Sequence, residues 1–100
     1  MKIELKKFGT TLVSRQTGRE ALSAFAPTIK TVGSQEKIEV DFAGVITFSP
    51  SWGDEFLTPL LRDYGDKVIL VHTGNPSVRA TITILEKIIG NKFVTDNSIF

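Results

Sequence analysis

The sequence predicts an α/β domain with about three helices packed on a mixed four- to five-stranded sheet. Short alternating or wholly apolar runs are typical of strands, and stretches with helical spacing of apolar residues separate them. Strands that alternate with helices favour parallel neighbours joined by right-handed crossovers. A length of 100 residues fits one domain, so residues 1–100 are expected to share a single core.

Four segments are predicted as strands. Apolar residues alternate with charged ones within residues 2–7 and again within 37–42, as in half-buried strands. Residues 67–72 form a short apolar run, which is typical of a buried strand. Residues 10–13 follow a glycine turn and are expected to form a further short strand.

The first helix is predicted from about residue 14. A capping box of Thr17 with Glu20 favours one start, and Ser14 would cap an earlier one. Pro27 has no N–H and clashes with the preceding turn, so the helix is expected to end or kink near Ala26. Its apolar face is formed by Leu22, Phe25, Ala26 and Ile29.

The second helix follows the apolar residues 45–48 and opens at Ser49 or at Ser51. Pro59 lies inside its periodic pattern, which indicates either a kink or a second short helix capped by Thr58. Its apolar face carries four residues spaced by four: Trp52, Phe56, Leu60 and Tyr64.

The third helix has the clearest boundaries. Asn75 is a favoured N-cap, Pro76 suits the first helical position, and Gly90 is a natural stop. Residues 91–100 are then expected to form a short last strand or a packed tail. The apolar face of this helix comprises Val78, Ile82, Leu85 and Ile89.

The composition is that of an ordinary globular protein, with 41% apolar and 23% charged residues and a net charge of +1. This near-neutral charge predicts no binding to nucleic acid or to a membrane surface. The chain has no cysteine, which excludes disulfides and thiolate metal sites, and its first residues lack the apolar stretch of a signal peptide. We therefore expect a soluble cytoplasmic protein without metal or cofactor.

Three short motifs follow one another along the chain. Ser14–Arg15 precedes the first helix, Asp–Phe–x–Gly–Val occupies residues 41–45, and Ser–Trp–Gly–Asp–Glu occupies residues 51–55. In this order they resemble a prokaryotic STAS-like family of unknown function, which is related to the STAS domains of bacterial anti-sigma-factor antagonists. The resemblance covers residues 3–89.

This resemblance implies a STAS-like fold and a regulatory module that binds another protein. In the antagonists, a partner ATPase of the histidine-kinase type phosphorylates a serine at the start of the second helix, and that position falls on Ser51. The chain departs from their pattern: Ser49 replaces an acidic residue, Pro50 replaces a serine, and Trp52 replaces a glycine. An unmodified recognition surface is therefore the alternative to a phosphorylated one. A homodimer stays open beside the protein partner.

The surface expected to meet a protein partner comprises Ser49, Ser51, Trp52, Asp54 and Glu55. Alternatives for these residues stay open. Ser51 with Asp54 also has capping-box spacing, and acidic residues in a first turn complement the helix dipole. Trp52 is a binding hot spot if it is exposed and a core residue if it is buried. The two acidic side chains either meet a basic partner or pair with Arg15 inside the fold.

A second group of polar or turn-forming residues follows two of the strands: Asp41, Gly44, His72 and Asn75. Ligand sites of α/β proteins lie at the carboxyl ends of parallel strands, so a small-ligand or nucleotide sensor is the alternative function. Asp41 is also expected to accept a hydrogen bond that stabilises its loop. A hydrolase built on Ser51 and His72 is disfavoured, because the chain has one histidine and no Gly–x–Ser–x–Gly turn. The protein is therefore not expected to be an enzyme.

Overall fold

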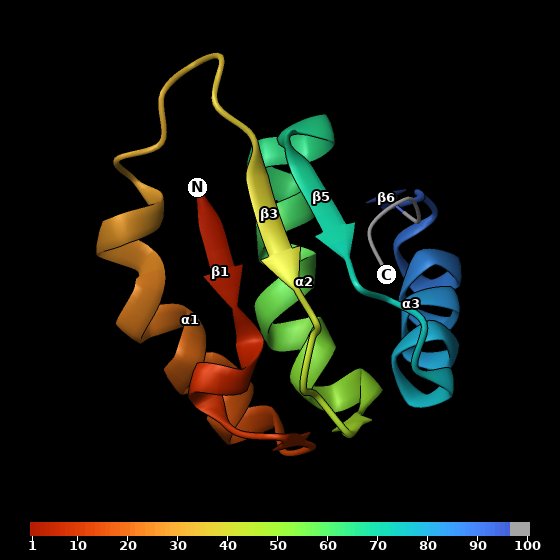
Figure 1. Ribbon diagram of the computed structural model, residues 1–100. Helices are drawn as coiled ribbons and strands as arrows, with labels where there is room; N and C mark the ends of the chain where they lie inside the picture. The colour runs from red at the N-terminus through yellow and green to blue at the C-terminus, as the bar shows by residue number, and fades with distance from the viewer. Residues whose placement is uncertain (97–100) are drawn as a thin grey trace.

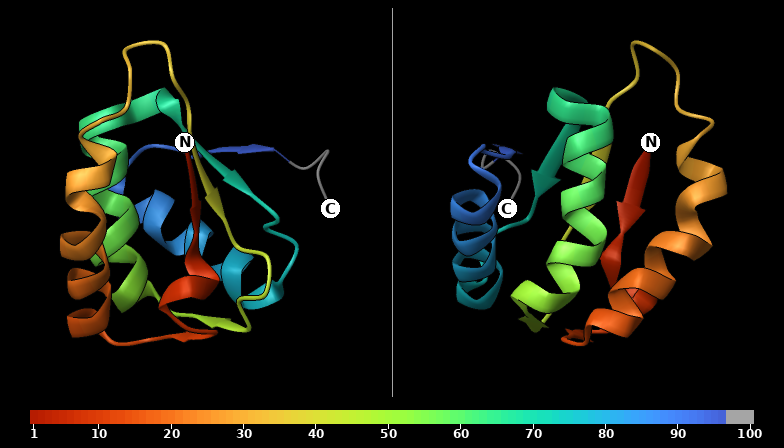
Figure 2. Two further views of the ribbon diagram at one scale, coloured as in Figure 1. Left: turned by 60° about the vertical axis from the view of Figure 1, so that its left-hand side comes forward. Right: turned by 180° about the vertical axis from the view of Figure 1, so that it is seen from behind.

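In the computed structural model, which describes residues 1–96, three helices pack on one face of a parallel sheet (Figures 1 and 2). The strand order of this sheet is β1–β3–β5–β6, and every neighbouring pair is parallel. The predicted α/β class with three helices is confirmed, although the described sheet is parallel throughout and not mixed. Its strands are Lys2–Glu4 (β1), Ile38–Asp41 (β3), Val68–Val71 (β5) and Val94–Asp96 (β6).

A second, two-stranded sheet pairs Thr11–Leu12 (β2) with Thr47–Phe48 (β4), again in parallel. The 3-10 turn Leu5–Phe8 (η1) separates β1 from β2, so these two strands enter different sheets. Strand β2 leads into the first helix and β4 into the second. Pairing of the two strands therefore holds the starts of both helices side by side.

The three helices are Arg15–Ile29 (α1), Pro50–Tyr64 (α2) and Pro76–Ile89 (α3), and α2 lies between the other two (Figure 2). The 3-10 turn Gly65–Lys67 (η2) connects α2 to β5. Both internal prolines are accommodated within single helices. The expectation that α1 ends near Ala26 is wrong, since the helix continues through Pro27, and Pro59 does not divide α2 into two helices.

The helix boundaries follow their capping residues. The hydroxyl of Ser14 accepts a hydrogen bond from the N–H of Thr17 at 3.1 Å, so the earlier of the two predicted starts of α1 is correct and the Thr17–Glu20 box is wrong. Asn75 caps α3 through the N–H groups of Ser77 and Val78, and Gly90 ends it in the left-handed conformation, as predicted.

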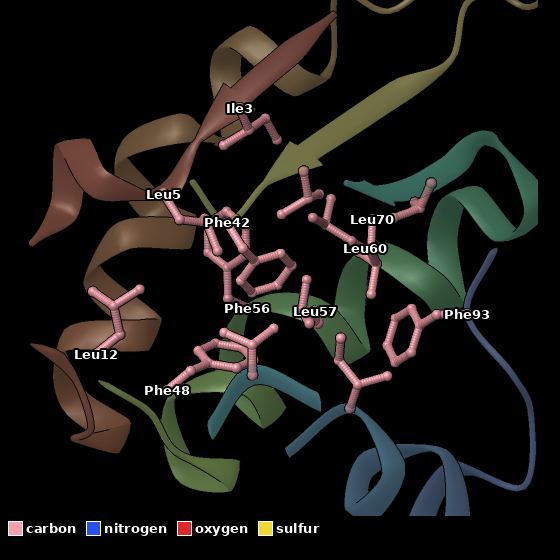
Figure 3. Close-up of a cluster of buried hydrophobic side chains, with 14 of the residues drawn as sticks. Ile3, Leu5, Leu12, Phe42, Phe48, Phe56, Leu57, Leu60, Leu70 and Phe93 are labelled. Atoms are coloured by element: carbon pink, nitrogen blue, oxygen red, sulfur yellow. The ribbon is translucent and has the colours of Figure 1, made fainter. Parts of the chain in front are cut away.

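The core lies between the sheet and the helices. The helix-facing row of the sheet includes Ile3, Val40 and Leu70, which are fully buried. Aromatic side chains from β4 and α2 fill the space above this row (Figure 3). Among the described residues no helix covers the opposite face of the sheet, where the register places Lys2 beside Glu39 (Figure 1).

None of the helices within residues 1–96 combines the length and the apolar character that a membrane crossing requires. The last residues of the expected C-terminal strand or tail, 97–100, lie outside the described part of the chain.

Candidate functional site

The starts of α1 and α2 are joined by polar contacts. Ser49 caps α2, because its hydroxyl accepts a hydrogen bond from the N–H of Trp52 at 3.3 Å. The same hydroxyl donates to the carbonyl of Val13, just ahead of α1, at 2.6 Å. One serine therefore fixes the start of α2 and ties it to the segment that enters α1. The sequence motifs at residues 14–15 and 51–55 consequently lie next to each other.

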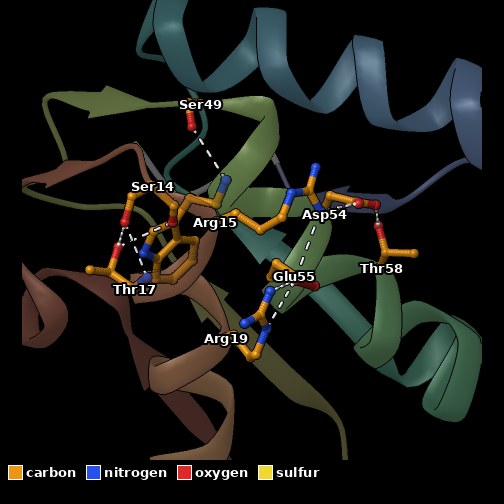
Figure 4. Close-up of polar contacts among 9 residues, drawn as sticks. Ser14, Arg15, Thr17, Arg19, Ser49, Asp54, Glu55 and Thr58 are labelled. Atoms are coloured by element: carbon orange, nitrogen blue, oxygen red, sulfur yellow. Dashed lines mark hydrogen bonds and ion pairs between the residues drawn. The ribbon is translucent and has the colours of Figure 1, made fainter.

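Two arginines of α1 pair with two acidic residues of α2 (Figure 4). Arg15 Nη1 donates to Asp54 Oδ2 at 2.8 Å, and Arg19 donates twice to Glu55 Oε1, at 3.0 and 3.2 Å. The predicted pairing of Arg15 inside the fold is confirmed. The hydrogen bond from Arg15 lowers the pKa of Asp54, which stays ionised to more acidic pH than an ordinary aspartate.

Asp54 does not cap α2. Its Oδ1 accepts a hydrogen bond from the hydroxyl of Thr58, one turn further along the helix, at 3.0 Å. With Arg15 on one carboxylate oxygen and Thr58 on the other, the side chain is held in one orientation. The expected capping box of Ser51 with Asp54 is therefore wrong, since the cap is Ser49.

Ser51 occupies the second position of α2, after Pro50. Its side chain is half-buried and has no hydrogen-bond partner among residues 1–96. The first turn of a helix favours negative charge, because its N–H groups point outward along the dipole. Ser51 is thus a hydroxyl on the first turn of α2 that the described fold does not use.

Trp52 is a core residue, with 1% of its surface exposed. Its ring stacks on Phe56 with a centroid distance of 5.0 Å and meets Phe48 edge-on at 5.8 Å. The alternative in which Trp52 is an exposed hot spot is wrong, because the side chain lies under α2 and not on its outer face. The surface that a partner can reach in this segment is therefore formed by its polar residues.

A groove of about 730 Å³ runs between α2 and α3. Ile88, which is 69% exposed, lies along it. Large apolar side chains exposed beside a groove are typical of binding surfaces. The α2 side of the groove begins at Asp54, so the groove continues the surface predicted from the sequence. Its main lining residues are Asp54, Thr58, Leu61, Arg62, Ile88 and Ile89.

The groove was not predicted from the sequence. The signal was present in α3, where Ile84 and Ile88 are spaced by four residues but fall outside the buried stripe that defines the helix. An apolar pair off the core-facing stripe indicates a second apolar surface on the same helix.

A second polar cluster forms at the carboxyl end of the main sheet. Asp41, which is buried at the end of β3, lies 2.7 Å from His72 Nδ1 at the end of β5. It also accepts a hydrogen bond from the N–H of Ala43 at 2.9 Å, as the loop prediction requires, and lies 3.4 Å from Lys2 Nζ. His72 has a φ of 56°, the left-handed region that residues other than glycine seldom adopt.

The loop that follows β3 packs against the loop that follows β5. The side-chain amide of Asn75 donates to the carbonyls of Val45 and Ile46, at 3.1 and 3.0 Å. Gly44 has a φ of 85° and turns the first of these loops. The four residues predicted from the sequence for this edge of the sheet therefore lie at the end of β3 and in two loops that contact each other. None of the four main cavities within residues 1–96 is lined by Gly44, Ser51 or His72.

Burial acts to raise the pKa of Asp41, but the hydrogen bonds from Ala43, His72 and Lys2 together outweigh it, so the pKa is lowered. The ionised carboxylate therefore stabilises the fold above the ordinary pKa of aspartate, and this contribution is lost as the pH falls through the lowered value. Replacing Asp41 with asparagine should reduce the free energy of unfolding at neutral pH by about 1–3 kcal/mol.

Urea unfolding at neutral and acidic pH measures this effect, with Glu39→Gln on the same strand as the control. The deficit of Asp41→Asn should shrink at acidic pH, whereas Glu39→Gln should stay near wild type. An equal deficit at every pH would contradict the assignment of these contacts to the ionised carboxylate.

Within residues 1–96, no three histidine, cysteine, aspartate or glutamate side chains are grouped so that they could hold a metal ion. Comparison of the chain with known protein families, with curated proteins and with solved structures finds no match. The resemblance to STAS-like domains therefore rests on the sequence motifs alone.

Proposed function

We propose that the protein is a STAS-like regulatory module that binds another protein through the groove between α2 and α3. The observation that carries this proposal is the exposed Ile88 beside a groove whose opposite wall begins at the orientated carboxylate of Asp54. The module is not an enzyme and needs no cofactor. It acts in the cytoplasm, on a protein and not on nucleic acid or a membrane.

The groove has the composition of a protein-binding surface. Its apolar wall consists of Leu61, Ile88 and Ile89, and Asp54 and Arg62 supply charges of both signs at the rim. Recognition surfaces typically combine an apolar centre with a polar rim that selects the partner. The pairing of Asp54 with Arg15 adds rigidity, because a carboxylate held in one orientation loses little entropy when a partner binds.

The partner is proposed to be an ATPase of the histidine-kinase type, as the resemblance to anti-sigma-factor antagonists implies. Ser51 is the proposed phosphoacceptor, since it lies on the first turn of α2 with its hydroxyl unused by the described residues. Phosphorylation would add between one and two negative charges near Asp54, at the beginning of the groove. Such a charge would change the affinity for the partner without a change of fold.

Capture of partners from extracts of the source organism tests this proposal. The immobilised baits are the wild type, Ile88→Asp, Ser51→Asp and the control Ile46→Asp. Ile46 is 65% exposed, close to the 69% of Ile88, but lies in the loop after β3 and away from the groove. A charge placed in an apolar contact must be desolvated, so Ile88→Asp should weaken capture of the partner by about tenfold or more.

Ile46→Asp should capture the partner as the wild type does, and Ser51→Asp should change the amount captured. Identical partners in identical amounts from all four baits would refute the proposal. Circular dichroism of each bait ensures that a lost partner reflects the surface and not an unfolded chain.

A further inference from the structure

A cleft of about 460 Å³ lies between α3 and β6, at the carboxyl end of β5. Thr73 and Gly74, which follow β5, form one end of it, and the segment that carries Lys92 and Phe93 forms a side. In open parallel sheets, small ligands bind outside the carboxyl ends of the strands. The volume also falls within the few hundred to about 1,000 Å³ that is typical of small-molecule sites.

The cleft exists because the helix-facing row of the sheet becomes polar at its last strand. Ile3, Val40 and Leu70 fill this row on the first three strands and are fully buried. Thr95 occupies the same row on β6 and is exposed. The side chain of a threonine is shorter than that of isoleucine or leucine and leaves a gap under α3, where Thr95 lines the cleft.

Two basic side chains line the cleft from different elements, Arg79 from α3 and Lys92 from the segment before β6. Among residues 1–96, neither the guanidinium of Arg79 nor the ammonium of Lys92 has an ion-pair or hydrogen-bond partner. Every other arginine of the chain is paired with an acidic residue. The charge of Arg79 is therefore available to a ligand.

Glu86 is the acidic residue of the cleft, and one of its oxygens is already in use. Its Oε2 accepts a hydrogen bond from the N–H of Phe93 at 2.8 Å. This contact holds the segment before β6 against α3 and so fixes the width of the cleft. Arg79, Thr83 and Glu86 are spaced along one face of α3, which places the cation nearer Thr73 and the carboxylate nearer the end of the helix.

We propose that this cleft binds a small organic anion, whose phosphate or carboxylate group is held by Arg79 and Lys92. Guanidinium groups bind both anions through paired N–H donors. Thr95 adds a further polar group to the cleft wall, and Ile82 and Phe93 supply an apolar floor for the organic part. This ligand site is separate from the groove between α2 and α3 and does not depend on the proposed protein partner.

Titration of the ¹⁵N-labelled protein, followed by NMR, tests the inference with three probes: phenyl phosphate, benzoate and the neutral benzyl alcohol. At least one of the two anions should cause saturable shifts centred on the amides of Thr73, Gly74, Thr83 and Lys92. Arg79→Gln and Lys92→Gln should each lower the affinity for that anion by about tenfold. Loss of one charged hydrogen bond worth about 1.4 kcal/mol gives this ratio.

Lys37→Gln removes a charge from the exposed segment before β3, which does not line the cleft, and serves as the matched control. It should leave the affinity unchanged, and the spectra themselves report whether each variant is folded. The relative affinities of phenyl phosphate and benzoate identify the anionic group. The proposal is overturned if neither anion gives saturable shifts at the cleft, if benzyl alcohol binds equally well, or if all three variants lose the same affinity.

Discussion

Trp52→Ala should reduce the free energy of unfolding by about 3–5 kcal/mol, the range for removal of a large buried aromatic side chain. The ring contacts Phe48 and Phe56 and is almost completely buried, so its loss leaves a cavity that these neighbours cannot fill. Since small domains are stable by about 5–15 kcal/mol, this variant should be close to unfolding at room temperature.

Urea unfolding measures the loss, and Trp52→Phe provides the matched comparison because it retains an aromatic ring in the same place. The phenylalanine variant should lose clearly less stability than the alanine variant. Trp52 is also the only tryptophan, so its fluorescence in the wild type reports burial directly. A loss below about 1 kcal/mol, typical of surface substitutions, would contradict the core position of Trp52.

Gly18→Ala should also destabilise the fold, by about 1–3 kcal/mol, as overpacked positions do. A Cβ atom at Gly18 would lie 2.6 Å from the carbonyl oxygen and 3.1 Å from the Cα of Trp52. These are backbone atoms of α2, so the clash can be relieved only if the two helices move apart. The sign of the effect is diagnostic, because alanine favours an isolated helix over glycine by about 1 kcal/mol.

Ser23→Ala on the exposed side of α1 is the control for helix propensity, and it should leave the stability unchanged or raise it slightly. Thermal unfolding of both variants gives the comparison. A more stable Gly18→Ala protein would show that α1 and α2 do not approach as closely as the structure has them. In that case, the pairing of Arg15 with Asp54 would also need a different geometry.

Local patterns were sufficient to predict much of the fold. The alternation within residues 37–42 places Val40 in the core, and Asn75 with Gly90 fixes both ends of α3. These features depend on residues close together in the sequence and are therefore predictable from it. The pairing of Arg15 with Asp54 was one of two options and followed from opposite charges at the starts of adjacent helices.

Features that depend on tertiary packing were not predictable in this way. The two prolines fall within helices because packing against neighbouring helices outweighs the lost hydrogen bond of each. Ser49 and Ser51 both suit a cap, and the contacts of Ser49 with Trp52 and with Val13 in the folded chain distinguish them. The close approach at Gly18 depends on where α1 and α2 cross, and a single sequence does not predict that position.

The candidate site was predicted in part. The sequence predicted Asp54 as part of a partner surface, and Asp54 lines the groove, but Ile88 and Ile89 of the apolar wall come from α3, more than 20 residues further along the chain. Likewise, the cleft beside β6 combines Arg79 with Lys92, which no motif connects. Both surfaces arise from the packing of α3 on its neighbours, and both are therefore properties of the folded chain.

Site-specific photo-crosslinking in living cells tests the central claim most directly. A photoreactive amino acid is placed at position 88 in the groove or at position 46 in the loop after β3, two sites of matched exposure. The probe at position 88 should form an adduct with one protein, identified by mass spectrometry as an ATPase of the histidine-kinase type, and the probe at position 46 should not. Adducts that are the same at both positions, or absent from both, would contradict a protein-binding groove between α2 and α3.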